Sequence, residues 1–208
     1  MTQKILKMLF SCIAIATFLS ACTTTQKITQ SARSATEQLL ITESVLRSLP
    51  KDRDLSFPMP RASKVKLDVT GVSADKDIVK GIVAGWLGMH GYMPVEEGAS
   101  YRINIIVNSL GTELATTFFG IPPISSTFFP LSLPELAIYK SESQLGYSKF
   151  HFDIFETASG QFLASSSPFL AGAFYNKYTL FFMFTFDKSN LASPPEIKTI
   201  TQELAKEL

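Results

Sequence analysis

The chain has 208 residues, and its 19 Lys and Arg against 18 Asp and Glu give a formal net charge of +1 at pH 7. This near-neutral balance gives no electrostatic footprint for nucleic acid, so we expect no nucleic-acid partner. Cys12 and Cys22 both lie near the N-terminus, outside the predicted folded domain, so only His90 and His151 remain for an ordinary transition-metal site, and we expect neither a metal nor another cofactor.

The first 21 residues have the composition of a secretory signal peptide. Lys4 and Lys7 precede an apolar run at residues 8–19, and small residues follow it. As a helix this run would rise only ~18 Å, whereas the hydrocarbon core of a bilayer is ~30 Å thick. We therefore predict that residues 1–21 are a cleavable signal rather than a permanent membrane span.

The tetrapeptide Leu19-Ser20-Ala21-Cys22 closely resembles the lipobox of bacterial lipoproteins, in which Leu is followed by Ser or Ala, a small residue and Cys. The resemblance implies transfer of diacylglycerol to the Cys22 sulfur, cleavage before Cys22 and, in many bacteria, acylation of the new amine, with palmitate as the expected fatty acid. Two or three acyl chains give lasting attachment, whereas one chain alone binds only marginally. An ordinary signal peptide with a chance cysteine is the alternative.

Thr23 follows the cysteine, at the position where enterobacterial lipoproteins of the inner membrane carry Asp. By that resemblance we expect attachment to the outer membrane, with the protein facing the periplasm. The polar residues 22–30 are predicted to be a short lipidated tether, and residues 31–208 a single domain.

Removal of 21 of the 208 residues leaves 187, a length that suits one domain. The loss of Lys4 and Lys7 changes the formal net charge from +1 to −1. Because Cys12 leaves with the signal and Cys22 carries lipid, the mature domain has no thiol for a disulfide. Packing alone is expected to hold its fold.

A helix is predicted over residues 31–49, because apolar residues that include Leu39, Leu46 and Leu49 recur at helical spacing and Pro50 can end it. Docking on a sheet is the favoured role of this face, and contact with a partner helix is the alternative. A strand at residues 64–69 follows, with apolar and polar residues in alternation.

A second helix is predicted over residues 76–90, with Ser73 or Asp75 as its cap. Its buried side would carry Ile78, Ile82 and Trp86. Glycines interrupt it at positions 81, 85 and 88, and each interior Gly costs ~1 kcal/mol relative to Ala. Their clustering indicates either close approach to a neighbouring backbone or simply a weak helix.

Further strands are predicted at residues 92–96, 101–109, 147–156, 161–166 and 178–186, with a turn at residues 158–160 and a final helix at residues 195–208. This order predicts an α+β fold with an α/β-like first half. We expect a single domain in which two or three helices pack on a mostly antiparallel or mixed sheet.

An uncharged segment at residues 114–134 includes Phe118, Phe119, Phe128 and Phe129. Its four prolines argue against a membrane-spanning helix, because each removes a backbone donor. We interpret the segment as a loop with two alternative roles. It either covers the core, or presents these four Phe side chains to a partner or to the membrane surface.

Signals for catalysis are weak. Ser73 and Lys76 match the Ser-x-x-Lys pattern of penicilloyl-transferring enzymes, but the companion Ser-Asp-Asn and Lys-Thr-Gly patterns are missing. We interpret Ser73 as a cap, His90 as a cation at a helix end, and His151 as a surface residue without a nucleophile. We expect a protein that is not an enzyme.

Beyond the lipobox, four segments spread over about 110 residues resemble bacterial lipoproteins of unknown function; they are Ser31-Ala-Arg-Ser-Ala-Thr-Glu-Gln-Leu-Leu40, Leu110-Gly-Thr-Glu113, Gly120-Ile-Pro122 and Pro134-Glu-Leu-Ala-Ile-Tyr-Lys140. The order helix, strand, helix, strand is also similar to that of periplasmic lipoproteins such as the curli secretion channel subunit. Neither resemblance supplies a functional residue.

Three functions follow as hypotheses. The leading one is a membrane-anchored envelope lipoprotein that binds a partner or assists assembly through its membrane-near surface. The second is a subunit of an oligomeric outer-membrane secretion pore, to which residues 147–156 and 178–186 would donate strands. The third is a periplasmic hydrolase that would depend on Ser73 or His151.

Overall fold

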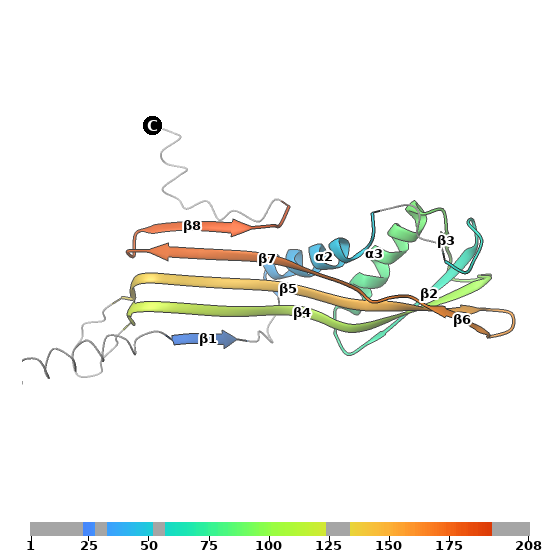
Figure 1. The fold of residues 1–208 in the computed structure, drawn as a ribbon, viewed down its shortest axis with the longest axis horizontal. Coiled ribbons are helices and arrows are strands. Elements are labelled where there is room, and N and C mark those ends of the chain that lie inside the picture. Colours follow the sequence, from blue (N-terminus) through green and yellow to red (C-terminus); the bar gives the residue numbers. More distant parts are fainter. Residues whose placement is uncertain (1–22, 28–32, 52–56, 124–133, 193–208) are drawn as a thin grey trace, which may run out of the picture. The chain divides into compact units, whose positions relative to one another are not determined.

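The computed structural model of the chain describes residues 23–27, 33–51, 57–123 and 134–192. The predicted signal peptide, Cys22, Phe128, Phe129 and the predicted final helix lie outside these residues. The elements in chain order (Figure 1) are β1 (Thr23–Lys27), α2 (Ala35–Ser48), β2 (Lys64–Gly71), α3 (Lys76–Met89), β3 (Met93–Pro94), β4 (Tyr101–Ile121), β5 (Leu136–Glu156), β6 (Phe162–Ser165), β7 (Phe169–Leu180) and β8 (Phe184–Ser189).

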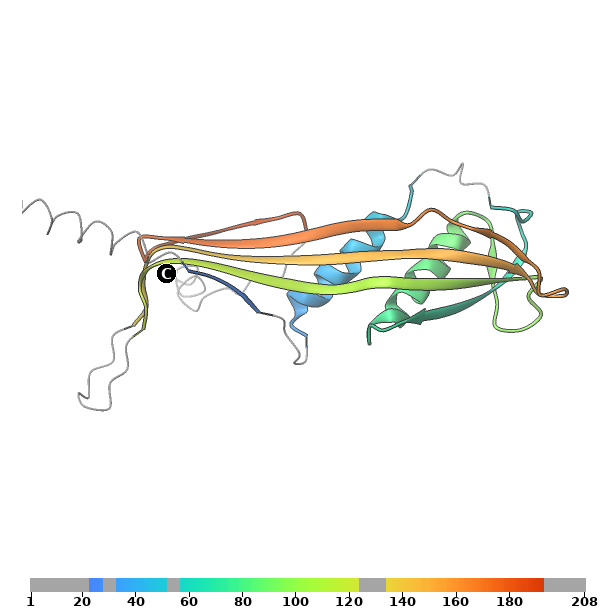
Figure 2. The same cartoon turned by 60° about the horizontal axis from the view of Figure 1, so that its bottom comes forward.

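The strands form one mixed sheet in the order β3-β2-β4-β5-β7-β8, with β1 also paired to β4 and β6 to β5. Strand β2 is parallel to both β3 and β4, whereas the pairs β1–β4 and β5–β6 are antiparallel. Both helices cross the same face of the sheet (Figure 2). The predicted α+β class, with helices packed on a mixed sheet, is confirmed.

The chain divides into two compact units, to which β4, β5 and β7 each contribute. In the part of the chain that the structure describes, the strand unit consists of residues 23–27, 113–123, 134–144 and 176–188. The helix unit consists there of residues 33–51, 57–112, 145–175 and 189–192 and holds α2, α3, β2 and β3.

Helix α2 begins at a capping box rather than at the predicted residue 31. The Glu37 backbone N–H donates to the Ser34 hydroxyl at 3.2 Å, and the Ser34 N–H donates to the Glu37 carboxylate at 2.8 Å. The helix ends before Pro50, as predicted, because a residue that precedes proline avoids helical backbone angles. Its buried face is centred on Leu40, Ile41, Ser44 and Val45, whereas the predicted Leu46 is exposed.

Helix α3 buries Val79, Val83, Trp86 and Leu87, so the prediction of Trp86 is confirmed and that of Ile78, which is exposed, is wrong. Asp75 is the residue before its first turn but makes no side-chain cap bond. Its carboxylate instead pairs with Arg33 at 2.7 Å, which ties the start of α3 to the residues before α2.

The glycines of α3 do not meet a neighbouring backbone. A Cβ at Gly81, Gly85 or Gly88 would have nothing within 4 Å. Close approach occurs instead at Gly146 of β5, where a Cβ would lie 2.4 Å from the Leu40 carbonyl oxygen. Glycine is therefore needed where β5 meets α2.

The predicted alternation at residues 147–156 is confirmed in β5. Phe150, Phe152 and Ile154 are at most 1% exposed and form part of the core of the helix unit. The Phe152 ring lies 4.8 Å from that of Phe169 and 6.3 Å from that of Trp86, measured between centroids. This aromatic cluster joins α3 to two strands.

Two predictions in the second half are wrong. Residues 114–121 are not loop but the continuation of β4, where Thr and Phe supply strand propensity. Residues 178–186 are not one strand, because β7 ends at Leu180 and β8 begins at Phe184. Between them Phe181 and Phe182 adopt positive φ angles of 45° and 50°, which reverse the chain. The predicted turn at residues 158–160 does connect β5 to β6.

Candidate functional site

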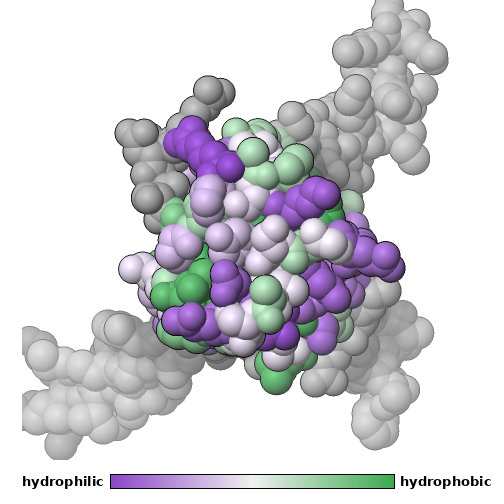
Figure 3. Space-filling view, turned by 90° about the vertical axis from the view of Figure 1, so that its right-hand side faces the viewer, coloured by the Kyte–Doolittle hydropathy of each residue, from purple (hydrophilic) through white to green (hydrophobic). Residues whose placement is uncertain are grey.

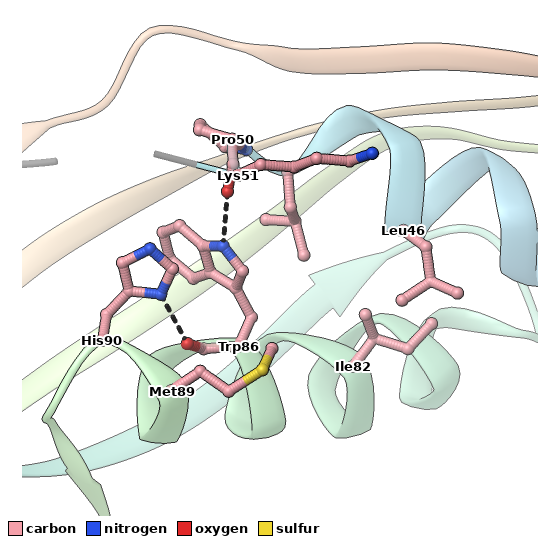
Figure 4. Close-up of a pocket in the computed structure, with 8 residues that line it drawn as sticks. Leu46, Pro50, Lys51, Ile82, Trp86, Met89 and His90 are labelled. Carbon is pink, nitrogen blue, oxygen red and sulfur yellow. Dashed lines mark hydrogen bonds between the residues drawn. The ribbon is translucent and has the colours of Figure 1, made fainter. Parts of the chain in front are cut away.

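The helix unit contains an open cavity of about 540 Å³, which we name the helix groove (Figure 4). Its lining comes from the second half of α2, the residues just after it and the second half of α3, namely Leu46, Leu49, Pro50, Lys51, Ile82, Trp86, Met89 and His90. The extended backbone at Leu49 ends α2, and the next residue, Pro50, contacts Trp86 of α3.

The wall formed by Trp86 is fixed by hydrogen bonds. The Trp86 indole N–H donates to the Pro50 carbonyl oxygen at 2.9 Å, which holds the segment after α2 against α3. The His90 Nδ1 lies 2.8 Å from the Trp86 carbonyl oxygen, and the two rings are 4.3 Å apart between centroids. The side chain predicted to be a simple helix-end cation thus lies over an aromatic ring at one end of the groove.

The chemistry of the groove is apolar with one charge. Met89 is 73% exposed, and Leu46 and Ile82 provide further aliphatic surface. Lys51 is the lining residue with a permanent positive charge, and Figure 4 shows its amine on the side of Leu46. Such a surface can hold an apolar side chain or acyl group, with a carboxylate or phosphate near Lys51.

The strand unit has a different exposed feature, which we name the apolar rim. It consists of exposed side chains where β4 ends, β5 begins and β7 turns into β8, namely Ile121, Leu136, Phe181, Phe182, Met183 and Phe184. The Phe181 and Phe182 backbone N–H groups donate to the carbonyl oxygens of Ile138 and Ala137, at 2.9 and 2.8 Å. A Cβ on Gly120 would lie 2.2 Å from the Leu136 carbonyl oxygen, so the end of β4 also packs against β5.

The predicted lipid-attachment residue, Cys22, directly precedes β1, and β1 pairs with the last part of β4. Strand β1 begins at Thr23, directly after Cys22, and runs antiparallel to β4 with Thr23 opposite Phe118. Residues 23–27 of the predicted tether are therefore strand. Of the four predicted contact residues, Phe118 and Phe119 lie half-buried on β4, and Phe128 and Phe129 lie outside the described residues.

The charged part of the strand unit near the rim is an ion-paired cluster. The Lys140 amine lies 3.1 Å from the Glu135 carboxylate and 3.2 Å from that of Glu142. Partial burial acts to lower the pKa of Lys140, but hydrogen bonds and charge attraction from Glu135 and Glu142 outweigh it and raise the pKa above its ordinary value. Lys140 is therefore held in its charged form.

The residues weighed for catalysis have separate partners. The Ser73 hydroxyl accepts a hydrogen bond from the Asp75 N–H at 3.3 Å. The His151 Nδ1 lies 3.0 Å from the Asn108 side-chain oxygen, and its Nε2 lies 4.0 Å from the Asp153 carboxylate. Among the described residues, no three His, Cys, Asp or Glu side chains gather to hold a metal ion. No helix in the same residues is both long and apolar enough to cross a membrane.

Sequence reasoning identified Trp86 as buried but missed the helix groove and the apolar rim. The groove depends on how α2 and α3 approach each other, which no local pattern specifies. The rim left a signal, since residues 178–186 hold five aromatic residues and no charge. An uncharged aromatic run was compatible with a buried strand, and the turn within it, without Gly or Asn, lacked the usual marker.

Comparison with solved structures yields weak fold likenesses. No protein-family model matches the chain, and no curated protein does. A PelC dodecamer from Paraburkholderia phytofirmans aligns with 83% of this chain and 85% of its own, at 8% identity and a TM-score of 0.29. A minor lipoprotein from Acinetobacter baumannii aligns over 71% and 78%, at 12% identity and a TM-score of 0.29. Likenesses of this size carry no inference about function.

Proposed function

We propose that this chain is a cell-envelope lipoprotein, attached to the periplasmic side of the outer membrane through lipid on Cys22, which binds a partner in its helix groove. The lipobox supports the attachment. The observation that carries the binding role is the open groove of about 540 Å³ between α2 and α3, whose walls are mainly apolar. The partner should present an apolar group with an acidic group beside it, to match Lys51.

The attachment is tested by the mass of the N-terminal peptide of the mature protein. We expect Cys22 to be the first residue and to carry diacylglycerol together with an amide-linked fatty acid such as palmitate. Cys22→Ala should abolish both the lipid and recovery with outer membranes. An unmodified Cys22, or a mature chain that begins elsewhere, would refute the attachment.

Binding in the groove is tested with photo-crosslinking residues in living cells. Met89 and Leu46 are exposed lining residues and suit the probe, whereas Val72 is a fully exposed apolar residue of the helix unit outside the groove and serves as the control. We expect one protein to be attached at both groove positions and not at position 72. Lys51→Glu should weaken this adduct, and equal labelling at position 72 would count against the groove.

A contact through Phe118, Phe119, Phe128 and Phe129 is a separate part of the proposal. A crosslinking residue at Phe119 or Phe128 should capture a protein or lipid, and Cys22→Ala should remove that adduct if nearness to the membrane is required. Crosslinks only within the same chain would assign these side chains to the packing of this protein.

A pore subunit is a second candidate, favoured by one observation. Strand β8 is at the edge of the sheet and is exposed from Phe184 to Lys188, so its backbone can pair with a strand of another copy. Of the two segments predicted to donate pore strands, residues 147–156 place Phe150 and Phe152 in the core of the helix unit, which makes this segment unsuitable. A single-chain mass by light scattering of the detergent-purified lipoprotein would exclude this candidate.

A further inference from the structure

We infer that the apolar rim of the strand unit lies in the interfacial layer of the same membrane that holds the lipid of Cys22. The inference rests on the attachment in the proposed function and deepens it. It makes the folded protein, and not only its lipid, a contact with the bilayer. The rim is Ile121, Leu136, Phe181, Phe182, Met183 and Phe184, as defined above.

The exposed chemistry of the rim suits this layer. Phe181, Phe182 and Met183 are 59%, 60% and 66% exposed, and they are consecutive at a chain reversal. No charged residue occurs from Tyr178 to Phe186. A concentration of exposed apolar side chains marks an interaction surface, and aromatic rings are enriched at membrane interfaces.

The backbone N–H groups of the turn at Phe181, Phe182 and Met183 are already hydrogen-bonded within the protein, so the turn can enter an apolar layer. The N–H groups of Phe181 and Phe182 donate to β5, and the Met183 N–H donates to the Leu180 carbonyl oxygen at 3.3 Å. Next to the turn, the hydroxyls of Thr179 and Thr185 lie 3.3 Å apart and bond to each other. Backbone donors that enter an apolar medium must be paired within the protein, and these three are.

The backbone conformation gives an independent reason. Phe181 and Phe182 have φ angles of 45° and 50°, a region in which Gly and Asn are favoured and a bulky side chain is strained. A turn that only reversed the chain in water would be more stable with Gly or Asn at these positions. The backbone strain at these two exposed Phe residues is explained if their rings serve to contact something beyond the protein.

Strand β1 brings the lipidated end to this part of the strand unit. Thr23 pairs with Phe118, and β4 continues for only three residues to Ile121 in the rim. Because β1 is antiparallel to β4, its first residue, Thr23, lies toward the end at which β4 stops. The lipid on Cys22 and the rim are therefore expected to meet the same bilayer.

The ion-paired cluster of Lys140, Glu135 and Glu142 limits how deeply the rim can enter the membrane. Glu135 precedes Leu136 of the rim directly, and its carboxylate is paired with Lys140. Charged groups are costly in the hydrocarbon core but are tolerated among headgroups. The rim should therefore sit at the boundary between headgroups and acyl chains and not cross it.

The test uses the mature lipidated protein, which begins at Cys22, in vesicles of phosphatidylethanolamine and phosphatidylglycerol. Since Cys12 is lost with the signal and Cys22 carries lipid, one introduced cysteine can be labelled with an environment-sensitive fluorophore. Phe182→Cys places the label in the rim. Ser159→Cys places it in the polar β5–β6 turn of the helix unit and is the matched control.

We expect the emission of the label at position 182 to shift to shorter wavelength and to be quenched by lipids that carry a nitroxide near the headgroup. The label at position 159 should show neither effect. A nitroxide at the end of the acyl chain should quench the label at position 182 less. Adding Phe181→Ser, an exposed position, should reduce the shallow quenching while the circular dichroism spectrum stays unchanged.

A label at position 182 that stays in water, in protein whose Cys22 lipid is verified by mass, would overturn the inference and leave the attachment intact. A blue shift that no lipid nitroxide quenches, and that grows with protein density in the vesicle, would assign the rim to a second copy of the chain and also overturn it. Loss of the Cys22 lipid itself would refute the attachment in the proposed function.

Discussion

The two units treat aromatic side chains in opposite ways. In the helix unit, Phe150 and Phe152 are completely buried because α2 and α3 cover that face of the sheet. The described residues of the strand unit contain strands as their only regular structure, and Phe181 and Phe182 remain exposed there. The end of the helix unit that carries the β5–β6 turn is also largely hydrophilic (Figure 3). Similar residues thus stabilise the fold in one unit and are exposed in the other.

The largest expected effect is the loss of a core aromatic residue from the helix unit. Phe152→Ala should lower the free energy of unfolding by ~3–5 kcal/mol, because it leaves a cavity among Phe57, Trp86 and Phe169. Urea denaturation monitored by Trp86 fluorescence measures this. Phe182→Ser in the strand unit is the contrasting change and should cost no more than ~0.5 kcal/mol. Equal losses in the two variants would show that the aromatic residues of the two units contribute alike to stability.

A smaller effect is expected where β5 meets α2. Gly146→Ala should lower the free energy of unfolding by ~1–3 kcal/mol, because the added Cβ would lie 2.4 Å from the Leu40 carbonyl oxygen and force the helix away. Gly85→Ala is the matched control, since the space around Gly85 is open, and it should stabilise α3 by up to ~1 kcal/mol. Thermal unfolding of the two variants should move in opposite directions.

The cap of α2 should contribute less again. Ser34→Ala removes the acceptor for the Glu37 N–H and should cost ~1 kcal/mol in the free energy of unfolding. Hydrogen exchange should show faster opening of the first turn of α2. Unchanged exchange in that turn would mean that the contacts of Arg33, rather than the capping box, fix the start of the helix.

The smallest effect concerns the charged cluster beside the rim. The pKa of Lys140 is raised in the folded state above its ordinary value of 10.5, so its contribution to stability is fully present below that pH. The contribution is lost as the pH rises through the folded-state value. Lys140→Met should therefore flatten the alkaline part of the stability profile, and a profile identical to that of the unchanged protein would show that the cluster adds nothing.

The elements that could be predicted from the sequence are those in which charged residues mark the exposed face or a proline marks an end. Lys149, His151 and Asp153 alternate with buried residues and reveal β5, and Pro50 marks the end of α2. Residues 114–121 and the turn at Phe181 lack these charges. The sequence therefore did not indicate that residues 114–121 continue a strand, or that the chain reverses at Phe181. The sequence left two explanations open for the glycines of α3, because a glycine in open space and a closely packed one cannot be told apart in a sequence.

The most direct test of the difference between the units is the reactivity of two matched cysteines in the lipidated protein on vesicles. Met89→Cys and Phe182→Cys replace side chains that are 73% and 60% exposed, so bare protein offers a water-soluble maleimide similar access to both. We expect rapid labelling at position 89 and slow labelling at position 182, because the membrane covers the rim and leaves the groove of the purified protein open to water. Equal rates at the two positions would contradict it.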